Sequence, residues 1–547
     1  MKSVCRISGV EFYISESEQA LRREFGVDTL PDLAPHIRIR HMGAFWPHWS
    51  LHKRRCDKTG KNIVSVFRPE CPYPVWHKDE WYRSALPPSA SFDFDQTFFS
   101  QTETLFKRCP IPHNSGLNNE NCEFTDDWWN SRNCYLCHSG VNTEDNRYCY
   151  RLIGCRNCLY VVFSFECEWC YDVINSEKCY RCVSGLYLKN CRETAFCYDC
   201  RNCSDCLFCF NLRNKQYCIG NKQLSKEEYE IQKKQFPYDT IQGYEHCKTL
   251  FEKMMREIAW HRSTYMDFVE NSSGNYILRL KNMQRTFLGA DGEDGYNVTR
   301  FGWAKTAVDS INLQEAERVF FSSGVQIKSY DVFCSFMLDN SRFARYSAYS
   351  SRCENIFGCC GLLGAKNAIL NTVYSQQEYD MLQKKLQDHM KSTGEWGQFF
   401  PGSFAPSPYD ESWWSFHFPL TLDEQRKAWY FALETSESPQ ANYVDAALLS
   451  STTESPEEIT QKTYWDSRVQ RPFQILPQDI AYCGVLGVPM PHRHYMGRIQ
   501  ENFRWMPYDG LLRETHCAHT WAKIETSWPS DYDGRILSES EYIKMVW

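Results

Sequence analysis

The sequence Cys155-Arg-Asn-Cys158 returns, with its two middle residues changed, as Cys167-Glu-Trp-Cys170 and as Cys179-Tyr-Arg-Cys182. The spacing of twelve residues continues in two series of cysteines: Cys155, Cys167, Cys179, Cys191 and Cys203, then Cys158, Cys170, Cys182, Cys206 and Cys218. Only Thr194 interrupts the second series. Such a short, regular period is typical of a chain that stacks each repeat on the one before it.

The residues between these cysteines favour strands over helices. They are rich in aromatic and β-branched types, and asparagine, serine and glycine interrupt them at short intervals. Asn190, Asn202 and Asn214 mark one turn position in step with the period. We therefore predict that residues 120–224 form a β-solenoid, either with twelve residues per coil or with half-coils of a larger rung.

The end of this repeat region is duplicated 150 residues further along the chain. The matching pairs are Cys203/Cys353, Cys209/Cys359, Leu212/Leu362 and Tyr229/Tyr379. Each copy continues into helix-forming residues after a serine, Ser225 or Ser375, which predicts a capping helix at both places. Because Ile356 stands in the second copy where the first has Cys206, some of the thiols are expected to be small apolar side chains in a narrow interior.

The two ends of the chain also resemble each other, at a shift of 461 residues. The matching pairs are Phe12/Phe473, Ile14/Ile475, Gly26/Gly487, Leu51/Leu512, Cys56/Cys517, Ile63/Ile524 and Glu80/Glu541. Exchanges of similar residues, Phe67 for Trp528 and Val75 for Ile536, follow the same register. We predict that the two ends share one fold, with Cys56 and Cys517 at equivalent positions.

Six stretches carry a resemblance to a known family. They are Lys53-Arg-Arg-Cys-Asp-Lys-Thr-Gly-Lys, Asp93-Phe-Asp, Asn211-Leu-Arg-Asn-Lys-Gln-Tyr-Cys, Ser225-Lys-Glu-Glu-Tyr-Glu, Gly394-Glu-Trp-Gly-Gln-Phe-Phe-Pro and Phe418-Pro-Leu-Thr. The chain thereby resembles uncharacterised cysteine-rich proteins of candidate-phyla-radiation bacteria, in which zinc-ribbon-like ends flank a cysteine-repeat middle. The resemblance implies an architecture and no activity. The ends here depart from the family's Cys-x-x-Cys pattern, since Cys5-Arg-Ile-Ser-Gly keeps a single thiol.

The fold predicted from these observations is mostly β with helical caps. Two tandem β-solenoid repeat blocks are flanked by two related small α+β zinc-ribbon-like terminal modules. The predicted segments are an N-terminal module (1–85), a linker (86–119), the first solenoid (120–224), capping and connecting helices (225–269), the second, degenerate solenoid (270–374), a capping helix (375–392), an aromatic and proline-rich connector (393–467) and the C-terminal module (468–547).

Composition is typical of a folded, multidomain chain. With 547 residues, 42% apolar and 15% aromatic, the chain exceeds one compact core. The net charge of -7 argues against nucleic-acid binding through the whole surface but leaves a local basic patch open. Without a long apolar segment near the N-terminus or elsewhere, we expect a cytoplasmic protein, or one inside a particle assembled there. In that reducing compartment the 28 cysteines are buried thiols or metal ligands rather than disulfides.

Zinc is the cofactor that the cysteines could bind. Zinc prefers four cysteine or histidine ligands, and neighbouring Cys-x-x-Cys pairs on strands about 4.8 Å apart could supply four thiolates. The alternative is a dry ladder of protonated thiols. The candidate ligands are Cys155, Cys158, Cys167, Cys170, Cys179 and Cys182 in the repeats, and Cys5, His36 and Cys56 in the N-terminal module.

A cluster of basic residues lies in the N-terminal module. Its members are Arg38, Arg40, Lys53, Arg54, Arg55, Lys58 and Lys61, with Phe45, Trp46 and Trp49 between them. Cations beside stackable rings suit phosphate and unpaired bases, so nucleic acid or another anionic partner could bind here. The alternative is a solvated charged rim around core aromatics.

The sequence favours a non-enzymatic binding or scaffold protein. It contains no complete phosphate loop, metalloprotease helix, nucleophile elbow or dinucleotide fingerprint. We expect it to dock a macromolecular partner, most simply a protein or an assembly, through its solenoid faces and basic module. Two alternatives stay open: a structural subunit of a larger assembly such as a particle shell, and a thiol-based metal-handling or redox protein.

Overall fold

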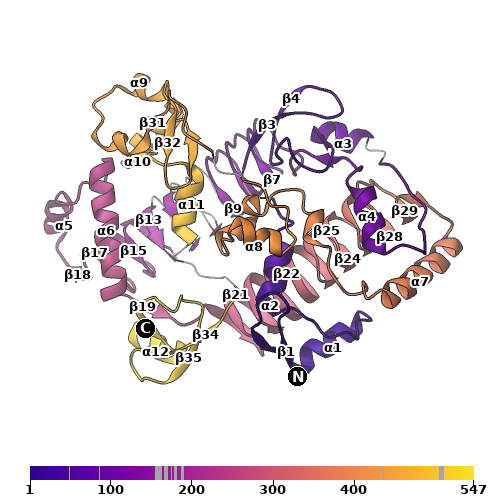
Figure 1. Ribbon diagram of the computed structural model, residues 1–547. Helices are drawn as coiled ribbons and strands as arrows, with labels where there is room; N and C mark the ends of the chain where they lie inside the picture. The colour runs from indigo at the N-terminus through magenta and orange to yellow at the C-terminus, as the bar shows by residue number, and fades with distance from the viewer. Residues whose placement is uncertain are drawn as a thin grey trace. The chain divides into compact units, whose positions relative to one another are not determined.

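The structure is a computed structural model of the whole chain (Figure 1). It describes residues 1–47, 50–84, 87–153, 163–165, 170–173, 175–177, 182–186, 190–434, 437–503, 505 and 510–546, with the backbone alone at 151–186. Within these described ranges, no helix combines the length and the apolar character needed to cross a membrane.

The chain divides into two compact units. Unit 1 contains residues 1–114, 264–435 and 508–512, and unit 2 contains residues 115–263, 436–507 and 513–547. The N-terminal module therefore belongs to the same unit as the second repeat region, while the first repeat region belongs with the C-terminal module. Neighbours along the sequence are thus separated between the units, an arrangement that the linear map of segments did not predict.

The repeat region of unit 2, here called stack 1, consists of short parallel strands. They are β7 (Asp126–Trp129), β8 (His138–Val141), β9 (Tyr150–Ile153), β10 (Phe163–Phe165), β11 (Cys170–Val173), β12 (Asn175–Glu177), β13 (Cys182–Leu186), β14 (Arg192–Ala195), β15 (Cys197–Tyr198), β16 (Ser204–Leu207) and β17 (Gln216–Ile219). Paired residues lie twelve positions apart, as in Asp126 with His138 and Cys206 with Cys218. One twelve-residue rung therefore stacks on the next.

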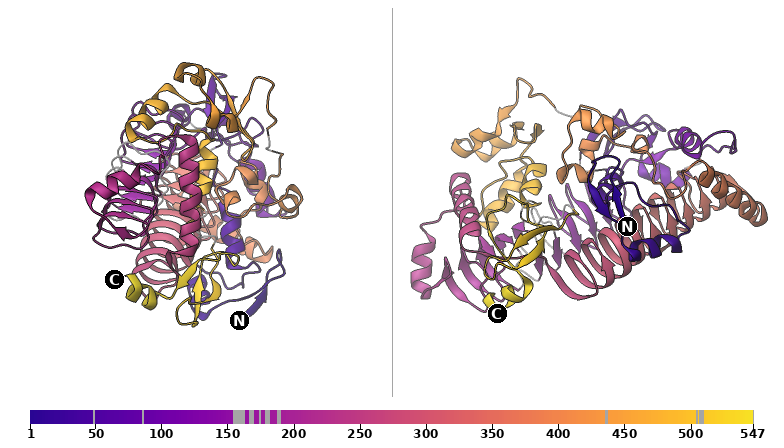
Figure 2. Two further views of the ribbon diagram at one scale, coloured as in Figure 1. Left: turned by 90° about the vertical axis from the view of Figure 1, so that its left-hand side faces the viewer. Right: turned by 60° about the horizontal axis from the view of Figure 1, so that its bottom comes forward.

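The repeat region of unit 1, stack 2, forms the largest sheet, which has 11 strands and curls (Figure 2). Its strands are β20 (Met266–Glu270), β21 (Gly274–Gln284), β22 (Thr286–Phe320), β23 (Ser323–Gln326), β24 (Ser329–Phe333), β25 (Phe336–Asp339), β26 (Arg342–Arg345), β27 (Ala348–Ser351), β28 (Glu354–Phe357), β29 (Lys366–Ile369) and β30 (Thr372–Val373). Partners again lie twelve residues apart, as in Ile277 with Gly289. The spacing is thirteen for pairs that span Ile327 and Lys328, two successive residues with positive φ, as in Val319 with Val332, and it returns to twelve from Tyr330 with Arg342 onward.

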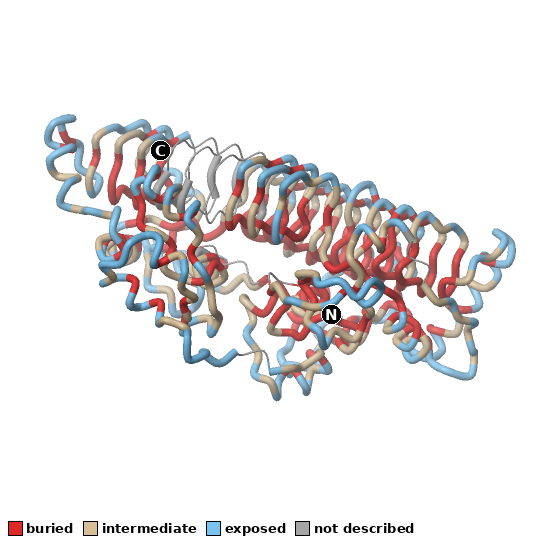
Figure 3. The backbone as a smooth tube through the Cα atoms, turned by 90° about the horizontal axis from the view of Figure 1, so that it is seen from above, coloured by how far each residue is buried: buried red, intermediate tan, exposed pale blue. Residues whose placement is uncertain are grey.

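Both stacks turn a corner at every third residue. In unit 2, positive φ angles recur from Asn190 through Glu193, Phe196 and Asp199 to Asn202, and so onward to Tyr217. A rung of twelve residues therefore has four sides, and the residue after each corner points inward, as the burial of the cysteines that follow corners indicates. Figure 3 shows buried residues recurring from rung to rung in each stack.

Asparagine stabilises these corners because its side chain tolerates positive φ and can bond to the next rung. Asn190, Asn202 and Asn214, the predicted turn positions, have φ angles of 54, 53 and 54°. The side-chain amide of Asn202 donates to Asn214 at 3.1 Å, and that of Asn190 donates to Asn202 at 3.4 Å. The turn positions inferred from the sequence are confirmed.

Both stacks end in the predicted helices. After β18 (Lys222–Gln223), helix α5 (Lys226–Lys233) begins behind Ser225, and after β30, helix α7 (Gln376–Ser392) begins behind Ser375. Each serine accepts the backbone N–H of the glutamate three residues on, and that glutamate accepts the serine N–H in return. The long helix α6 (Ile241–Glu257) follows α5 and buries Tyr244, Phe251 and Met255.

The two end modules contain the same elements in the same order. The N-terminal module has β1 (Lys2–Val4), β2 (Glu11–Tyr13), α1 (Glu16–Glu24), α2 (Pro35–Gly43), β3 (His52–Arg55), β4 (Asn62–Ser65), β5 (Val75–Trp76) and α3 (Lys78–Ser84). The C-terminal module has β32 (Tyr464–Asp466), β33 (Arg471–Phe473), α10 (Pro477–Leu486), α11 (Tyr495–Phe503), β34 (Arg513–His516), β35 (Lys523–Thr526), β36 (Arg535–Leu537) and α12 (Glu539–Val546). Most bounds differ by the predicted 461 residues within one or two positions, so the modules are duplicates.

The remaining elements connect these parts. They are α4 (Phe98–Phe106), β6 (Ile111–Pro112), β19 (Trp260–Arg262), η1 (Gly402–Phe404), η2 (Tyr409–Glu411), η3 (Trp413–Phe416), α8 (Leu422–Lys427), β31 (Val444–Asp445), η4 (Ala446–Ser451) and α9 (Pro456–Thr460). β6 pairs with β5 in unit 1, and β19 pairs with β36 in unit 2. Each module is thus tied to its unit by an added parallel strand.

The fold class is mixed α/β, with 26% helix and 32% strand. The prediction of a mostly β chain was wrong on this point, because each module contains three helices and two hairpins and the connector adds further helices. The zinc-ribbon-like part of the prediction stays a prediction. Among the described residues, no three or more His, Cys, Asp or Glu side chains form a group that could hold a metal ion.

Large inward side chains in the stacks face glycine in the neighbouring rung. A Cβ atom added to Gly140 would lie 2.2 Å from the ring of Trp128, twelve residues earlier in stack 1. Trp128 is fully buried, so its ring has little room to move aside. The glycine is therefore required by packing rather than by backbone conformation.

We expect Gly140→Ala to destabilise unit 2 by about 1–3 kcal/mol, as overpacked cores do. Gly484→Ala in α10 is the control, because its added Cβ would meet nothing within 4 Å, and the change should be neutral or slightly stabilising. Thermal unfolding of both variants measures the difference. Equal midpoints for both variants would contradict the inferred packing.

Candidate functional site

The structure separates the predicted basic cluster into buried and exposed residues. Arg38 is buried, where its guanidinium contacts Glu18 at 2.8 Å and Asp309 on β22. Arg22 approaches the same Asp309 carboxylate at 3.1 Å. Burial lowers the pKa of Arg38, but the two carboxylates outweigh this effect and raise the pKa overall. Arg38 therefore joins the N-terminal module to stack 2 and is not available to a partner.

The other basic residues lie on or near the hairpin of β3 and β4. Lys53, Arg55 and Lys61 are exposed, and they form no ion pair in the part of the chain that the structure describes. Arg54 is half-buried and donates to the carbonyl of Arg68 at 2.7 Å and to Asp57 at 2.8 Å. Among the described residues of the hairpin, Lys53, Arg55 and Lys61 are thus the exposed cations without an ion pair.

Two further basic residues complete the set. Arg40 is half-buried on α2, so it lies outside the exposed group. Lys58 is exposed, pairs with Glu80 at 3.2 Å and lies 4.8 Å from the ring centre of Trp76. We call Lys53, Arg55, Lys58 and Lys61 the basic hairpin.

The aromatic residues predicted to lie among these cations are not available for stacking. Phe45 and Trp46 are buried in unit 1, and Trp49 lies outside the described residues. The interpretation of these two as core aromatics, left open by the sequence, is therefore confirmed. Trp76 and His77, which the sequence reasoning did not single out, are half-exposed instead, and His77 stacks on His113 with 4.6 Å between ring centres.

Of the predicted zinc ligands, only Cys5, His36 and Cys56 have described side chains. Cys155, Cys158, Cys167 and Cys179 lie outside the described residues, and for Cys170 and Cys182 the backbone alone shows that they are paired neighbours. Cys5 follows β1 and Cys56 follows β3, so they lie in different hairpins, and His36 lies on α2. The three residues form no shared group of metal ligands.

The described cysteines of stack 1 form a continuous buried array. Its members are Cys134, Cys137, Cys149, Cys191, Cys197, Cys200, Cys203, Cys206, Cys209 and Cys218. All four inward positions of one rung, Cys197, Cys200, Cys203 and Cys206, are cysteine. None of the described cysteines is in a disulfide.

These thiols donate hydrogen bonds as protonated groups do. Cys197 donates to the carbonyl of Ala195 at 3.3 Å and to that of Cys206 at 3.5 Å. Burial raises the pKa of Cys197 and of Cys200 well above the ordinary value for a thiol. Bonds between thiols lower the pKa of Cys203 and raise that of Cys206. The geometry favours a dry ladder over a set of thiolate ligands.

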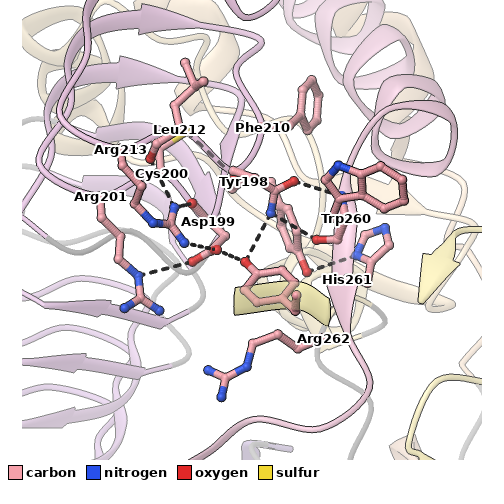
Figure 4. Close-up of polar contacts among 12 residues, drawn as sticks. Tyr198, Asp199, Cys200, Arg201, Phe210, Leu212, Arg213, Trp260, His261 and Arg262 are labelled. Carbon is pink, nitrogen blue, oxygen red and sulfur yellow. Dashed lines mark hydrogen bonds and ion pairs between the residues drawn. The ribbon is translucent and has the colours of Figure 1, made fainter. Parts of the chain in front are cut away.

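A second polar cluster lies where the C-terminal module meets the last rungs of stack 1 (Figure 4). Asp199 is buried and contacts Arg213 at 2.7 Å and Arg201 at 3.5 Å. Its carboxylate also accepts a hydrogen bond from the hydroxyl group of Tyr542 on α12. Its carboxylate thus links two rungs to a helix of the module. The residue was not foreseen, because nothing local in the sequence distinguishes it from other corner residues.

The neighbouring residues continue this link into β19. Asn211 accepts the backbone N–H of Trp260 at 2.8 Å and donates to the carbonyl of the same residue at 3.0 Å. His261 lies 2.9 Å from the hydroxyl of Tyr198 and 2.9 Å from the carbonyl of Met255, and burial lowers its pKa to about 4. His261 is therefore neutral near pH 7. Its partners fix its orientation, so the cluster serves to dock the module.

An equivalent acidic residue lies where each module meets its own stack: Asp479 binds the stack directly, whereas Glu18 holds Arg38 of its own module, and Arg38 binds Asp309 on stack 2. Glu18 on α1 contacts Arg38 in unit 1, and Asp479, which is 461 residues later on α10, accepts Arg147 at 3.0 Å and Tyr148 at 2.5 Å. Both carboxylates are buried. The sequence held a signal for this pair, since both positions are acidic at the shift of 461, but their partners are far apart in sequence.

Comparison with protein-family models, with curated proteins and with solved structures finds no match to this chain. The assignment of function therefore depends on the geometry described above.

Replacement of one ladder thiol by a similar apolar side chain should be tolerated. We expect Cys206→Val to cost less than about 1.5 kcal/mol, because a volume-conserving exchange in a core is cheap and stack 2 already has Ile356 at this position. Cys206→Asp is the contrasting variant, since it places an uncompensated carboxylate in the same interior. Chemical denaturation of both variants measures the effects. Equally severe losses would argue that the thiol itself is required, for example as a ligand.

Proposed function

We propose that this protein is a non-enzymatic scaffold that binds the phosphate backbone of single-stranded nucleic acid through the basic hairpin. The observation that carries the proposal is the exposure of Lys53, Arg55 and Lys61 without ion-pair partners among the described residues. Cations held in this way retain their full attraction for an external anion. A polyanion is the partner that such a surface fits best.

The spacing of the cations supports this choice. Lys53 and Arg55 are two residues apart on β3 and lie on the same face, about 7 Å from each other at a rise of 3.3 Å per residue. Lys58 and Lys61 follow in the turn. The carbonyl of Val75 accepts the N–H of Asp57 in the turn of this hairpin, so the chain after Val75 lies beside the turn. The next two residues, Trp76 and His77, are half-exposed there. Cations beside partly exposed rings suit phosphates and unpaired bases.

Comparison with the duplicate hairpin shows that the fold does not need these charges. At the shift of 461, β34 and β35 have Glu514, His516 and Ala522 where β3 and its turn have Lys53, Arg55 and Lys61. The two hairpins keep the same strand bounds in spite of this difference. The charges of the first hairpin therefore support a role beyond folding.

The two stacks supply the frame of this scaffold. We interpret each as a β-solenoid block, an interpretation supported by the parallel register of twelve and the corner at every third residue. The resemblance to the cysteine-repeat proteins stays a hypothesis of the same kind. A thiol-based metal or redox function has weaker support, because the described thiols of stack 1 donate to carbonyls.

The test is binding of fluorescent single-stranded oligonucleotides to the full chain at several salt concentrations. The triple variant Lys53→Gln, Arg55→Gln and Lys61→Gln should bind more weakly and should reduce the slope of log affinity against log salt by about 2, at roughly 0.7 for each phosphate that is no longer neutralised. The effect should not depend on base sequence, because binding to phosphates carries no sequence information.

A matched control removes three lysines elsewhere. Lys222, Lys226 and Lys234 are exposed around α5, and their replacement removes the same number of positive charges as the hairpin variant. Their replacement by glutamine should leave affinity and slope unchanged. Equal effects of the two triple variants, or no salt-dependent binding by the unmodified chain, would refute the proposal.

A subunit of a larger assembly is the second candidate, favoured by apolar side chains on the first hairpin. Val4, Val10 and Tyr13 are 57%, 53% and 73% exposed on and beside β1 and β2. Tyr13→Ser and Val4→Ser would then lower the solution mass from an oligomer to that of the 64.5 kDa chain. A monomeric mass for the unmodified chain would exclude this candidate.

A further inference from the structure

Each end module contains two hairpins whose turns have the same backbone. The residue that opens the turn is Cys5, Cys56, Asp466 or Cys517, and the fourth residue after it has positive φ in every case. Those four residues are Gly9, Gly60, Gln470 and Trp521, with φ angles of 68, 70, 52 and 61°. In unit 1, Cys56 donates its N–H to Lys61 at 2.9 Å, and in unit 2 Cys517 donates to Ala522 at 2.8 Å.

The opening side chain accepts a hydrogen bond from the same place in all four turns. The donor is the backbone N–H of the residue directly before a helix of the same module: α3 for Cys56, α12 for Cys517, α2 for Cys5 and α11 for Asp466. His77 donates to Cys56 at 3.3 Å, Ser538 to Cys517 at 3.5 Å, and His494 to the Asp466 carboxylate at 2.9 Å. Ala34 donates to Cys5 in the same way.

Further donors converge on these atoms from within the turn. The thiol of Cys517 accepts hydrogen bonds from His519 and Thr520, and that of Cys56 accepts from Lys58 and Thr59. Asp466 accepts the N–H of Arg468 at 3.0 Å, two residues on, as Cys517 does from His519. In each turn, several backbone N–H groups thus converge on the opening side chain, joined at Cys56 and Cys517 by a threonine hydroxyl; in the protonated form, the Cys517 thiol can donate to Ser538 at 3.9 Å.

This donor set does not fit zinc. A zinc knuckle would need a second thiolate three residues after the first, and those positions hold Ser8, Thr59, Val469 and Thr520. Hydroxyl groups of Thr59 and Thr520 donate to the thiol, which uses the lone pairs a metal would need. In the fourth turn a carboxylate has replaced the thiol without change of the surrounding backbone.

We propose that the four turns are closed by an anion in place of a zinc ion, a thiolate in three of them and the carboxylate of Asp466 in the fourth. The inference is carried by the presence of Cys5 in one module and Asp466 at the equivalent position of the other. A thiolate and a carboxylate are both negatively charged and both accept hydrogen bonds. As zinc ligands they differ, because the thiolate is soft and the carboxylate is hard. In this proposal Cys517 is a buried thiolate that accepts hydrogen bonds.

The local electrostatics of Cys517 agree with this role. Burial raises its pKa, but the donors from Thr520, Ser538 and His519 outweigh burial and hold the pKa at about 6, below the ordinary value of 9.0. The charged groups around it are His519 on the hairpin, which lies 2.5 Å from Glu541 on α12, and Lys544, which contacts the same glutamate at 2.6 Å. On β19, Arg262 pairs with Glu539 at 2.6 Å.

The experiment compares Cys517→Asp with Cys517→Ala in the full chain. We expect the aspartate variant to keep the melting temperature and the zinc content of the unmodified chain, because it reproduces the anion found at Asp466. The alanine variant should melt several degrees lower, since its donors lose their acceptor. If Cys517→Asp or Cys517→Ala fails to accumulate, the reciprocal variants Asp466→Cys and Asp466→Ala give the same comparison in the same unit.

Two results would overturn the proposal. One is the loss of about one zinc ion per chain in Cys517→Asp, measured by elemental analysis. The other is a melting temperature for Cys517→Asp as low as that of Cys517→Ala.

The dependence of stability on pH gives an independent readout. Because the folded pKa lies below the unfolded one, the contribution of the thiolate is complete above about pH 9 and is lost as the pH falls through about 6. The decrease in melting temperature between pH 9 and pH 6 should be smaller in Cys517→Asp, whose carboxylate stays charged there. His519→Gln is the control, because this side chain lies on the same hairpin and contacts Glu541. An unchanged profile in Cys517→Asp would count against the thiolate.

Discussion

Both stacks depend on one backbone constraint, a residue in the left-handed region at every third position. For an ordinary residue this conformation costs about 1 kcal/mol or more, and it costs least for asparagine, aspartate and glycine. Yet Phe208, Trp303 and Tyr346 also occupy corners. Their cost is offset because each corner N–H bonds to a carbonyl of the previous rung, as Phe208 does to Ala195 at 3.3 Å. The rungs are therefore stable as a stack and not singly.

A corner at every third residue leaves one inward side chain on each side of a rung. This spacing determines which side chains fit the interior. Ser322 in stack 2 donates to the carbonyl of Phe320 at 2.9 Å and accepts the N–H of Ser335, one rung on, at 3.1 Å. Cys359 in the same column donates to Phe357 and accepts from Asn371. Cysteine and serine both suit this position because they are small and both donate and accept. This geometry explains why cysteine is accepted at the described inward positions of stack 1.

The sequence predicted features that repeat or are local, and missed those that depend on distant partners. The period of twelve, the turn asparagines and the helices after Ser225 and Ser375 follow from spacing and capping chemistry alone. The burial of Arg38 could not be foreseen, because its partner Asp309 is 271 residues away and looks like any other corner aspartate. The helical content was underestimated since short helices such as α2 lack a clear apolar period. Of the candidate site, the basic hairpin was predictable, while Trp76 and His77 became visible only with β5 in place.

The duplicated modules separate what the fold requires from what each copy is free to change. Positions that keep their chemistry serve folding: Glu18 holds Arg38, which binds Asp309 on stack 2, and Asp479 binds Arg147 and Tyr148 of stack 1. Positions whose chemistry reverses cannot be required by the common fold, and Lys53 against Glu514 is such a pair. If the two hairpins once had the same sequence, the basic residues of the first were gained or kept by a selective demand that does not act on the second. That demand has to come from outside the module, which is why a partner of the hairpin explains the difference better than stability does.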